Sequence, residues 1–325
     1  MNVGSVSSGQ PRNICRSGKH MATTKEIKNH ISSVKDTQKI TNAMYLIAST
    51  KLRKAKSDLD RTRPYFTALQ DEIKRIFRTA GNVENKYFYP VTGEHEFPGS
   101  YGYLVITADK GLSGAYNQNV IKEALRLMEQ HENPKLFVVG EYGRHYFMSH
   151  NIPIEQSFLY TAYNPTIGRA RDISRILLER FNSGELAKIF VVYTDMQNAV
   201  NSQACSTRLI PFHRAQFTQT DSNEKAVKMP FEFQPSIETV LDNVVPSYVT
   251  GFIYSALIDS FCCEQNARMS AMDSANRNAQ KLLDELSLQY NHLRQSAITQ
   301  EITEVAAGAK NMRRKAEQRK RMEVQ

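Results

Sequence analysis

Apolar side chains recur at alternating intervals of four and three residues from Thr24 to about Ala80. Twelve of the fifteen positions in this repeat are apolar, which favours a long coiled-coil helix over a short helix on a globular core. The segment has no glycine and one proline, Pro64, where we expect a bend. We therefore predict a coiled-coil helix over residues 21–80. The repeat consists of Ile27, Ile31, Val34, Gln38, Thr41, Tyr45, Ala48, Leu52, Ala55, Leu59, Thr62, Phe66, Leu69, Ile73 and Ile76.

A second repeat of the same kind occupies the C-terminal part of the chain, after two helix-interrupting residues, Pro246 and Gly251. Nine of its eleven positions are apolar. We predict a coiled-coil helix over residues 237–312 and a basic tail over 313–325. Antiparallel pairing is the simplest way to bring the two terminal helices together. The repeat consists of Ile258, Cys262, Gln265, Met269, Met272, Asn276, Ala279, Leu283, Leu286, Tyr290 and Leu293, and it slips by one residue to Ile298, Ile302, Val305, Ala309 and Met312.

The first helix carries an additional apolar strip formed by Ile40, Met44 and Ile47, which lie off its main repeat. One face of the helix is needed for the partner helix, so the second face requires another cover. We interpret it as an intermolecular surface. Basic residues are interleaved with the strip and indicate that the opposing surface is acidic; they are Lys39, Lys51, Arg53, Lys54 and Lys56.

The segment from residue 100 to 215 has a different pattern. Buried-strand sequences at 103–108, 136–140 and 189–194 alternate with helical patterns, and 207–211 is predicted as an antiparallel edge strand. The fold class is therefore α/β plus a long antiparallel coiled coil, with a Rossmann-like open sheet domain inserted between the paired helices. Residues 216–236 are predicted to be a linker, and residues 1–20 a disordered leader, with Met21 the better start.

The composition gives the net charge of the chain and argues against several classes of protein. The net charge of +9 suggests an acidic partner, and the four cysteines show no disulfide or zinc spacing, as in reduced intracellular proteins. No apolar run is long enough to suggest a membrane span. The loop 109–117 follows the first strand, where doubly wound folds bind phosphate, but it matches neither GxGxxG nor the P-loop pattern. We predict no catalytic residues, no metal site and no cofactor.

Three functions remain open on these patterns. The first is a mechanical subunit of a larger assembly. The second is a basic coiled-coil nucleic-acid-binding protein, which the net charge and tail would suit. The third is a nucleotide-dependent α/β enzyme that uses loop 109–117.

Several long motifs resemble the gamma subunit of F-type ATP synthases of the bacterial type. KEIKNHISSVKDTQKITNAM (25–44) and STKLRKA (49–55) resemble its first helix. ARMSAMDSANRNA (267–279) and YNHLRQSAITQEITEVAAGA (290–309) resemble its last helix. The resemblance covers Met21 to Ala309 and implies a non-catalytic central rotor shaft that couples ion flow through the membrane sector to ATP synthesis or hydrolysis.

The resemblance also implies partners and roles. The coiled coil would stand in a head of three alpha and three beta subunits, and the α/β domain would contact epsilon and the ring of c subunits. The chain would then lie at the cytoplasmic face of the bacterial cell membrane, as a peripheral protein bound only through the complex, without nucleic acid. Met44 would face an acidic lever of a beta subunit. The expected subunit-coupling residues are Ile40, Met44, Ile47, Lys51, Arg268, Gln295, Thr299 and Glu301.

Overall fold

The computed structural model describes residues 24–80, 85–89, 99–131, 133–196, 202–213, 233–234 and 236–322. The expected leader, 1–20, and all but residues 233, 234 and 236 of the expected linker lie outside this part of the chain. The described residues belong to two compact units. One is Ile40–Asn276, and the other combines residues of Met1–Lys39 with residues of Arg277–Gln325.

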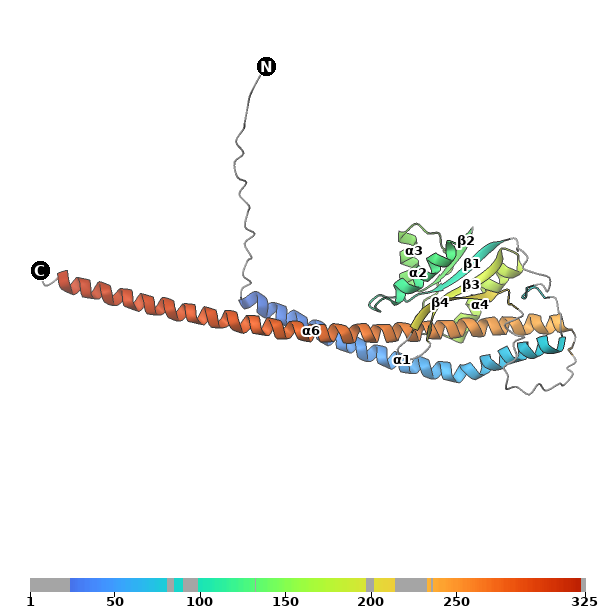
Figure 1. Ribbon diagram of the computed structural model, residues 1–325, viewed down its shortest axis with the longest axis horizontal. Coiled ribbons are helices and arrows are strands. Elements are labelled where there is room, and N and C mark those ends of the chain that lie inside the picture. Colours follow the sequence, from blue (N-terminus) through green and yellow to red (C-terminus); the bar gives the residue numbers. More distant parts are fainter. Residues whose placement is uncertain are drawn as a thin grey trace, which may run out of the picture. The chain divides into compact units, whose positions relative to one another are not determined.

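Two long helices pair in an antiparallel manner: α1 (Thr24–Ala80) and α6 (Ile237–Met322) (Figure 1). The direction follows from their contacts. Gln38 Nε2 donates to Gln280 Oε1 at 3.3 Å, the Thr41 hydroxyl donates to Asn276 Oδ1, and the Phe66 ring lies 6.0 Å from that of Tyr254. Every position of the α1 repeat is buried or half-buried, and so is every α6 position from Ile258 to Leu293. The predicted coiled coil is therefore confirmed.

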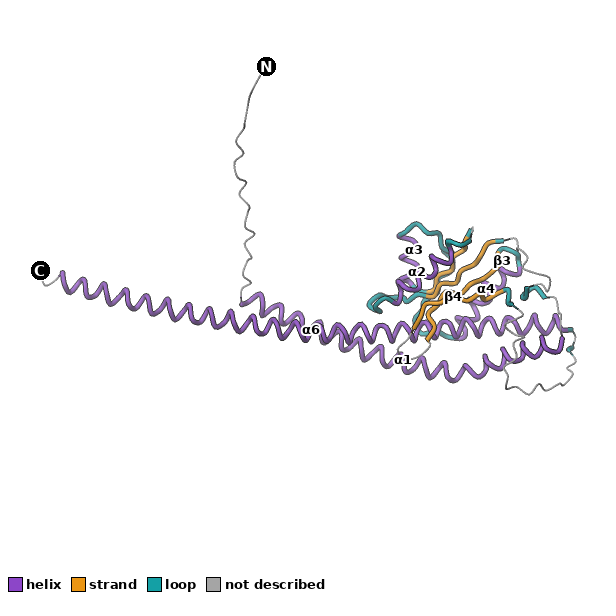
Figure 2. The backbone as a smooth tube through the Cα atoms, viewed as in Figure 1, coloured by secondary structure: helices purple, strands orange, loops and turns teal. Residues whose placement is uncertain are grey.

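Neither proline ends its helix. α1 continues through Pro64, and Figure 2 shows its path bending in the second half, which contains that residue. α6 runs through Pro246 and Gly251 without interruption, so their expected effect as helix breakers is wrong. At Gly251 the reason is packing, because the Phe66 ring of α1 fills the place where a side chain would stand. α6 also continues to Met322, well into the basic tail.

Within the described residues, one helix, α6, is long and apolar enough by length and composition to cross a membrane. More than half of the apolar window is buried inside the chain. The α6 side chains Leu241, Val245, Val249 and Ile253 are fully buried in the main core. The apolar character of this stretch is thus accounted for by packing within the protein.

The inserted domain is a four-stranded sheet in the order β2-β1-β3-β4. β1 pairs in parallel with both β2 and β3, and β4 pairs antiparallel with β3 at the edge. The predicted Rossmann-like open sheet and its antiparallel edge strand are confirmed. The strands are β1 (Ser100–Ile106), β2 (Pro134–Val139), β3 (Leu186–Met196) and β4 (Ser202–Ile210).

Helices cover both faces of this sheet. Alternate residues of β1 enter different cores, because successive strand side chains point to opposite faces. Tyr103 and Val105 pack with α2 (Tyr116–Met128) and α3 (Glu141–Ser149). Leu104 and Ile106 pack with α4 (Ile167–Asn182), α1 and α6. The coiled coil therefore forms part of the domain's own core, and Figure 1 shows α6 running along the sheet.

Candidate interaction surface

The loop after β1 lies where the strand order reverses, which is the usual ligand position in open α/β sheets. Several of its polar groups bond within the chain, although the buried Ser113 hydroxyl has no hydrogen-bond partner among the described residues. The Asn117 side-chain oxygen accepts from the Ala108 N–H at 2.9 Å, and its nitrogen donates to the Lys110 carbonyl at 3.5 Å. Leu112 and Gly114 take positive φ angles of 64° and 57°, which shape the turn. The arrangement puts a carboxylate, Asp109, where a phosphate would need positive charge.

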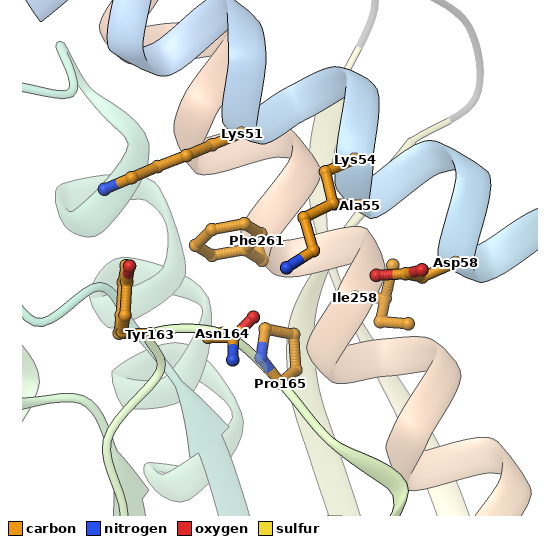
Figure 3. A pocket seen from close by; sticks show the side chains of 9 residues that line it. All are labelled: Lys51, Lys54, Ala55, Asp58, Tyr163, Asn164, Pro165, Ile258 and Phe261. Atoms are coloured by element: carbon orange, nitrogen blue, oxygen red, sulfur yellow. The ribbon is translucent and has the colours of Figure 1, made fainter.

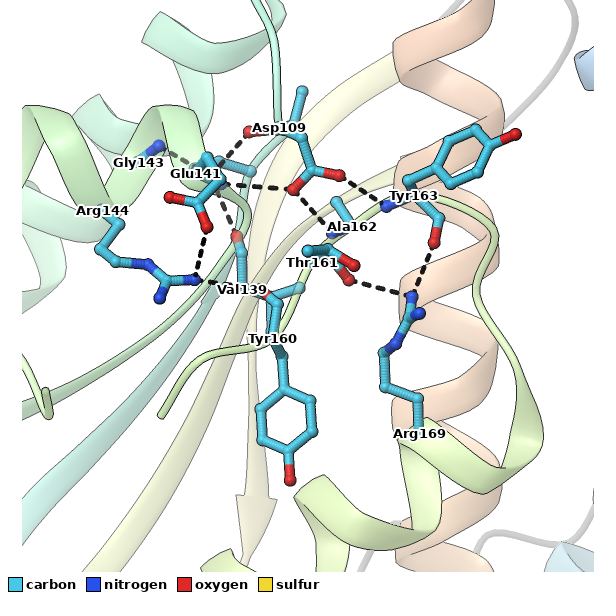
Figure 4. Close-up of polar contacts among 12 residues, drawn as sticks. Asp109, Val139, Glu141, Gly143, Arg144, Tyr160, Thr161, Ala162, Tyr163 and Arg169 are labelled. Carbon is cyan, nitrogen blue, oxygen red and sulfur yellow. Dashed lines mark hydrogen bonds and ion pairs between the residues drawn. The ribbon is translucent and has the colours of Figure 1, made fainter. Parts of the chain in front are cut away.

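Asp109 is bonded to three backbone N–H groups. Its Oδ1 accepts from Ala162 at 2.9 Å and from Glu141 at 3.3 Å, and its Oδ2 accepts from Tyr163 at 2.8 Å (Figure 4). Asp109 therefore holds the β1 loop against the segment 160–163 and against the start of α3. The only sequence signal for this role was its position directly after a buried strand.

Arg268 of α6 is engaged inside the chain. Its guanidinium pairs with Glu264 one turn earlier, and Nη2 donates to the carbonyls of Gly111 at 3.0 Å and Lys110 at 3.4 Å. The Arg268 side chain is only 12% exposed. Burial raises the pKa of Glu264, although Arg268 acts in the opposite direction. The structure thus gives Arg268 a role in holding the loop, which the sequence did not indicate.

The expected apolar strip on α1 is open to the surroundings. Ile40 is 61% exposed and Ile47 is 54% exposed, whereas Met44 is half-buried. Met44, Ile47 and Lys51 line one groove together with residues from the β1 loop and from α6. The other groove residues are Ala48, Asp109, Lys110, Gly111, Leu112, Tyr163, Glu264, Gln265 and Arg268.

Four of the predicted coupling residues therefore meet in this groove, which we call the α1–loop groove: Met44, Ile47, Lys51 and Arg268. Lys51 Nζ lies 4.7 Å from the centre of the Tyr163 ring, a cation–π contact. The neighbouring pocket in Figure 3 shows Lys51, Lys54 and Asp58 of α1 above Tyr163–Pro165, with Ile258 and Phe261 of α6. The groove thus combines apolar side chains with charged groups of both signs: Lys51, Lys110 and Arg268 against Asp109 and Glu264.

Gln295, Thr299 and Glu301 belong to the other compact unit and are all exposed on α6. Gln295 and Thr299 line a shallow groove, and the Thr299 hydroxyl donates to the Gln295 carbonyl at 2.9 Å. The apolar stripe that slips in register begins among them, at Ile298, and is uncovered. Ile298, Ile302, Val305 and Met312 are between 48% and 78% exposed.

The described residues contain no group of three His, Cys, Asp or Glu side chains that could hold a metal ion. Cys262 and Cys263 are buried, and burial raises the pKa of each thiol. Their place is in the two cores, where a thiol behaves as a small apolar side chain.

Residues 23–312 match the family described as ATP synthase. A curated relative named ATP synthase gamma chain, from Caldanaerobacter subterraneus, is 40% identical and covers 88% of this chain and 98% of its own. The ATP synthase gamma chain of Acetivibrio thermocellus is 36% identical and covers 90% of this chain and 100% of its own length. The "ATP synthase gamma chain, sodium ion specific" of Acetobacterium woodii is 35% identical over 87% and 97%.

Two solved structures share the fold. A chain of the Euglena gracilis mitochondrial ATP synthase matches with a TM-score of 0.61 and 14% identity over 89% of this chain and 94% of its own. A chain of the Tetrahymena thermophila ATP synthase central stalk and c-ring structure matches with a TM-score of 0.51 and 21% identity over 73% and 99%.

Fold and comparisons together define a subunit of the rotary ATP synthase. Within that class, the chain belongs to the gamma-chain family, which confirms the resemblance drawn from its motifs. It is a non-catalytic subunit of the membrane-bound complex, so the nucleotide-dependent enzyme is set aside. Nothing in the comparisons supports the nucleic-acid-binding alternative.

Proposed function

We propose that this chain is the central rotor shaft of an ion-translocating ATP synthase and couples ion flow to ATP synthesis or hydrolysis. The observation that carries the proposal is a pair of long helices, within a gamma-chain family member, whose apolar strips exceed what the chain itself covers. Paired helices suit a mechanical role, because their packed interface resists bending. The exposed apolar strips are suited to contact other subunits that surround the paired helices.

The surrounding subunits would be the alpha and beta subunits of the hexameric head. Exposed Ile40 and Ile47 offer apolar area, and the lysines around them favour an acidic partner surface such as a lever of a beta subunit. We infer that Ile40, Met44, Ile47 and Lys51 form the bearing for that lever. Arg268 would act there chiefly through the loop that it holds.

The second contact with the head would be on α6. Gln295, Thr299 and Glu301 present polar groups beside the uncovered stripe of Ile298 and Ile302. Polar side chains at the rim of an apolar strip are typical of protein interfaces. We infer that these three residues bond to the head while the stripe is enclosed by it.

At the other side of the complex, the α/β domain would contact the epsilon subunit and the ring of c subunits. The chain would then lie at the cytoplasmic face of the bacterial membrane as a peripheral protein, attached to the membrane only through the complex. The family resemblance of the motifs supports these assignments. Neither a cofactor nor nucleic acid is required.

Co-purification tests the proposal directly. A tagged chain expressed with its native partners should bring down alpha and beta subunits, and ATP hydrolysis should appear only in the assembly. Recovery of the chain without these subunits would contradict it. Retention on nucleic acid with a steep salt dependence would instead favour the nucleic-acid-binding alternative.

The bearing is tested by Met44→Lys. We expect the variant chain to fold and assemble, because Met44 is only half-buried, but to pump fewer ions per ATP hydrolysed. A new cation there would disturb an interface already set for charge. Met148→Lys is the matched control, since Met148 is 57% exposed on α3. Wild-type coupling in the Met44 variant would remove that residue from the bearing.

A further inference from the structure

Two loops of the α/β domain contact both α1 and α6, and we call them the collar: residues 109–112 after β1 and residues 160–164 before α4. Asp109 joins them, because its carboxylate accepts from the N–H groups of Ala162 and Tyr163 at 2.9 and 2.8 Å. A carboxylate that accepts backbone N–H groups makes charge-assisted hydrogen bonds, which are among the stronger ones in proteins.

Arg169, in the first turns of α4, holds the same segment by its carbonyl groups. Its Nη1 donates to the carbonyls of Tyr163 at 2.7 Å and Thr161 at 3.0 Å (Figure 4). The segment 161–163 is therefore fixed by its N–H groups from one side and by its carbonyl groups from another. An exposed stretch of irregular backbone would otherwise have few bonds to set its position.

The collar touches both helices of the coiled coil. On the α1 side, Lys51 lies over the Tyr163 ring, and Figure 3 shows the two side chains facing each other. On the α6 side, the Tyr163 ring meets Phe261 edge-on at 6.4 Å, and Arg268 donates to the carbonyls of Lys110 and Gly111. The α/β domain is thus fastened to both helices at one level.

We propose that Asp109 and Arg169 are positioning residues that lock the collar and so pass torque from the α/β domain to both helices of the shaft. The proposal rests on the rotor function proposed above. Its physical reason is the difference between contact types. The free energy of apolar burial has no preferred direction, whereas a hydrogen bond weakens steeply as its distance and angle depart from the optimum. A locked collar would also hold the exposed Leu112 tip at the α1–loop groove.

Asp109→Asn tests the lock, because the amide keeps the shape of the side chain and loses its charge and one acceptor oxygen. In the full-length chain, the amides of Ala162 and Tyr163 should exchange with deuterium about tenfold faster or more. In the assembled complex, ATP hydrolysis should persist while ion pumping per ATP is lost in part. Asp71→Asn is the matched control, since the Asp71 side chain is 44% exposed and pairs with Lys74 on α1, away from the two loops of the collar.

Tyr163 gives an independent arm that does not touch the Asp109 bonds. Tyr163→Phe keeps a ring under Lys51 and should retain coupling, whereas Tyr163→Leu should lose part of it. Faster exchange at the collar with unchanged coupling in both Asp109→Asn and Tyr163→Leu would overturn the proposal and leave the rotor assignment intact. Failure of the wild-type assembly to pump ions on ATP hydrolysis would instead count against the rotor function itself.

Discussion

Two stretches of α6 both carry regularly spaced apolar side chains, but only one of them is covered by the rest of the chain. In the packed stretch, residues 241–261, side chains such as Val245, Val249 and Ile253 are fully buried within the chain. In the uncovered stretch, residues 298–312, Ile302 and Val305 are 64% and 73% exposed. Periodicity alone therefore does not tell which stripe builds the fold and which is reserved for assembly.

The largest expected difference is in the free energy of unfolding when one isoleucine side chain in each stretch is shortened to alanine. Ile253→Ala should lower the free energy of unfolding of the isolated chain by about 2–5 kcal/mol, because it leaves a cavity in a closed core. Ile302→Ala should change it by less than about 0.5 kcal/mol. Urea denaturation of both variants measures the difference.

The order should reverse in the complex. Ile302→Asp should leave the isolated chain folded but reduce recovery of alpha and beta subunits with it, because a charge would enter an enclosed apolar strip. Equal stability losses from Ile253→Ala and Ile302→Ala would mean that the two stretches do not differ in the way described.

The next effect concerns a carboxyl group in the packed stretch. Burial, with a contribution from Asp195, raises the pKa of Asp259 to about 6. The folded chain therefore favours the protonated form, and this group's contribution to stability is present below about pH 4 and lost as pH rises to about 6. Asp259→Asn should remove that loss and raise the free energy of unfolding at pH 7 by up to about 3 kcal/mol.

Thermal unfolding between pH 4 and pH 7 measures this effect. Glu301→Gln in the uncovered stretch is the control and should change stability by less than about 0.5 kcal/mol, since Glu301 is exposed. A wild-type pH dependence in Asp259→Asn would show that the carboxyl is better solvated than its burial suggests.

Two glycines on the same helix, Gly308 and Gly251, should show smaller changes in the free energy of unfolding, and these changes should have opposite signs. Alanine is favoured over glycine in a helix by about 1 kcal/mol. Gly308→Ala should gain this amount, because nothing lies within reach of a new methyl group. At Gly251 the methyl carbon would stand 2.0 Å from the Phe66 ring, so Gly251→Ala should lose about 1–3 kcal/mol net. Two stabilising substitutions would mean that the ring has room to move.

The smallest effect is expected at the end of α6. Residues after Met312 lie outside the match to the family, and their described side chains are exposed. Truncation after Met312 should therefore keep both folding and assembly, with less than about 0.5 kcal/mol change in stability. Loss of alpha and beta subunits from the purified complex would make the tail a structural part of it.

Most of the fold could be predicted from the regular spacing of apolar residues along the sequence. The α1 repeat and the α6 repeat up to Leu293 proved buried or half-buried, and the alternating strand and helix patterns gave the sheet with its antiparallel edge. These features are local, since each depends on residues a few positions apart. Gly251 was misread because its role depends on Phe66, a residue of the other helix.

The polar contacts of the candidate site could not be found in the same way. Asp109 reaches a backbone segment more than fifty residues away, and Arg268 reaches carbonyl groups more than 150 residues away. Backbone acceptors and donors have no sequence signature, because every residue has them. The motifs drew attention to Arg268, Met44 and Lys51, but only the fold placed them at one groove with Tyr163 and Asp109.

The uncovered stripe of α6 also has a consequence for production of the protein. The isolated chain exposes an apolar surface on α6, formed by Ile298, Ile302, Val305 and Met312. Copies made in excess of their partners would tend to stick to one another or to chaperones through this surface. This chain and its partner subunits must therefore be synthesised in matching amounts. Excess copies of the chain would aggregate first through this stripe.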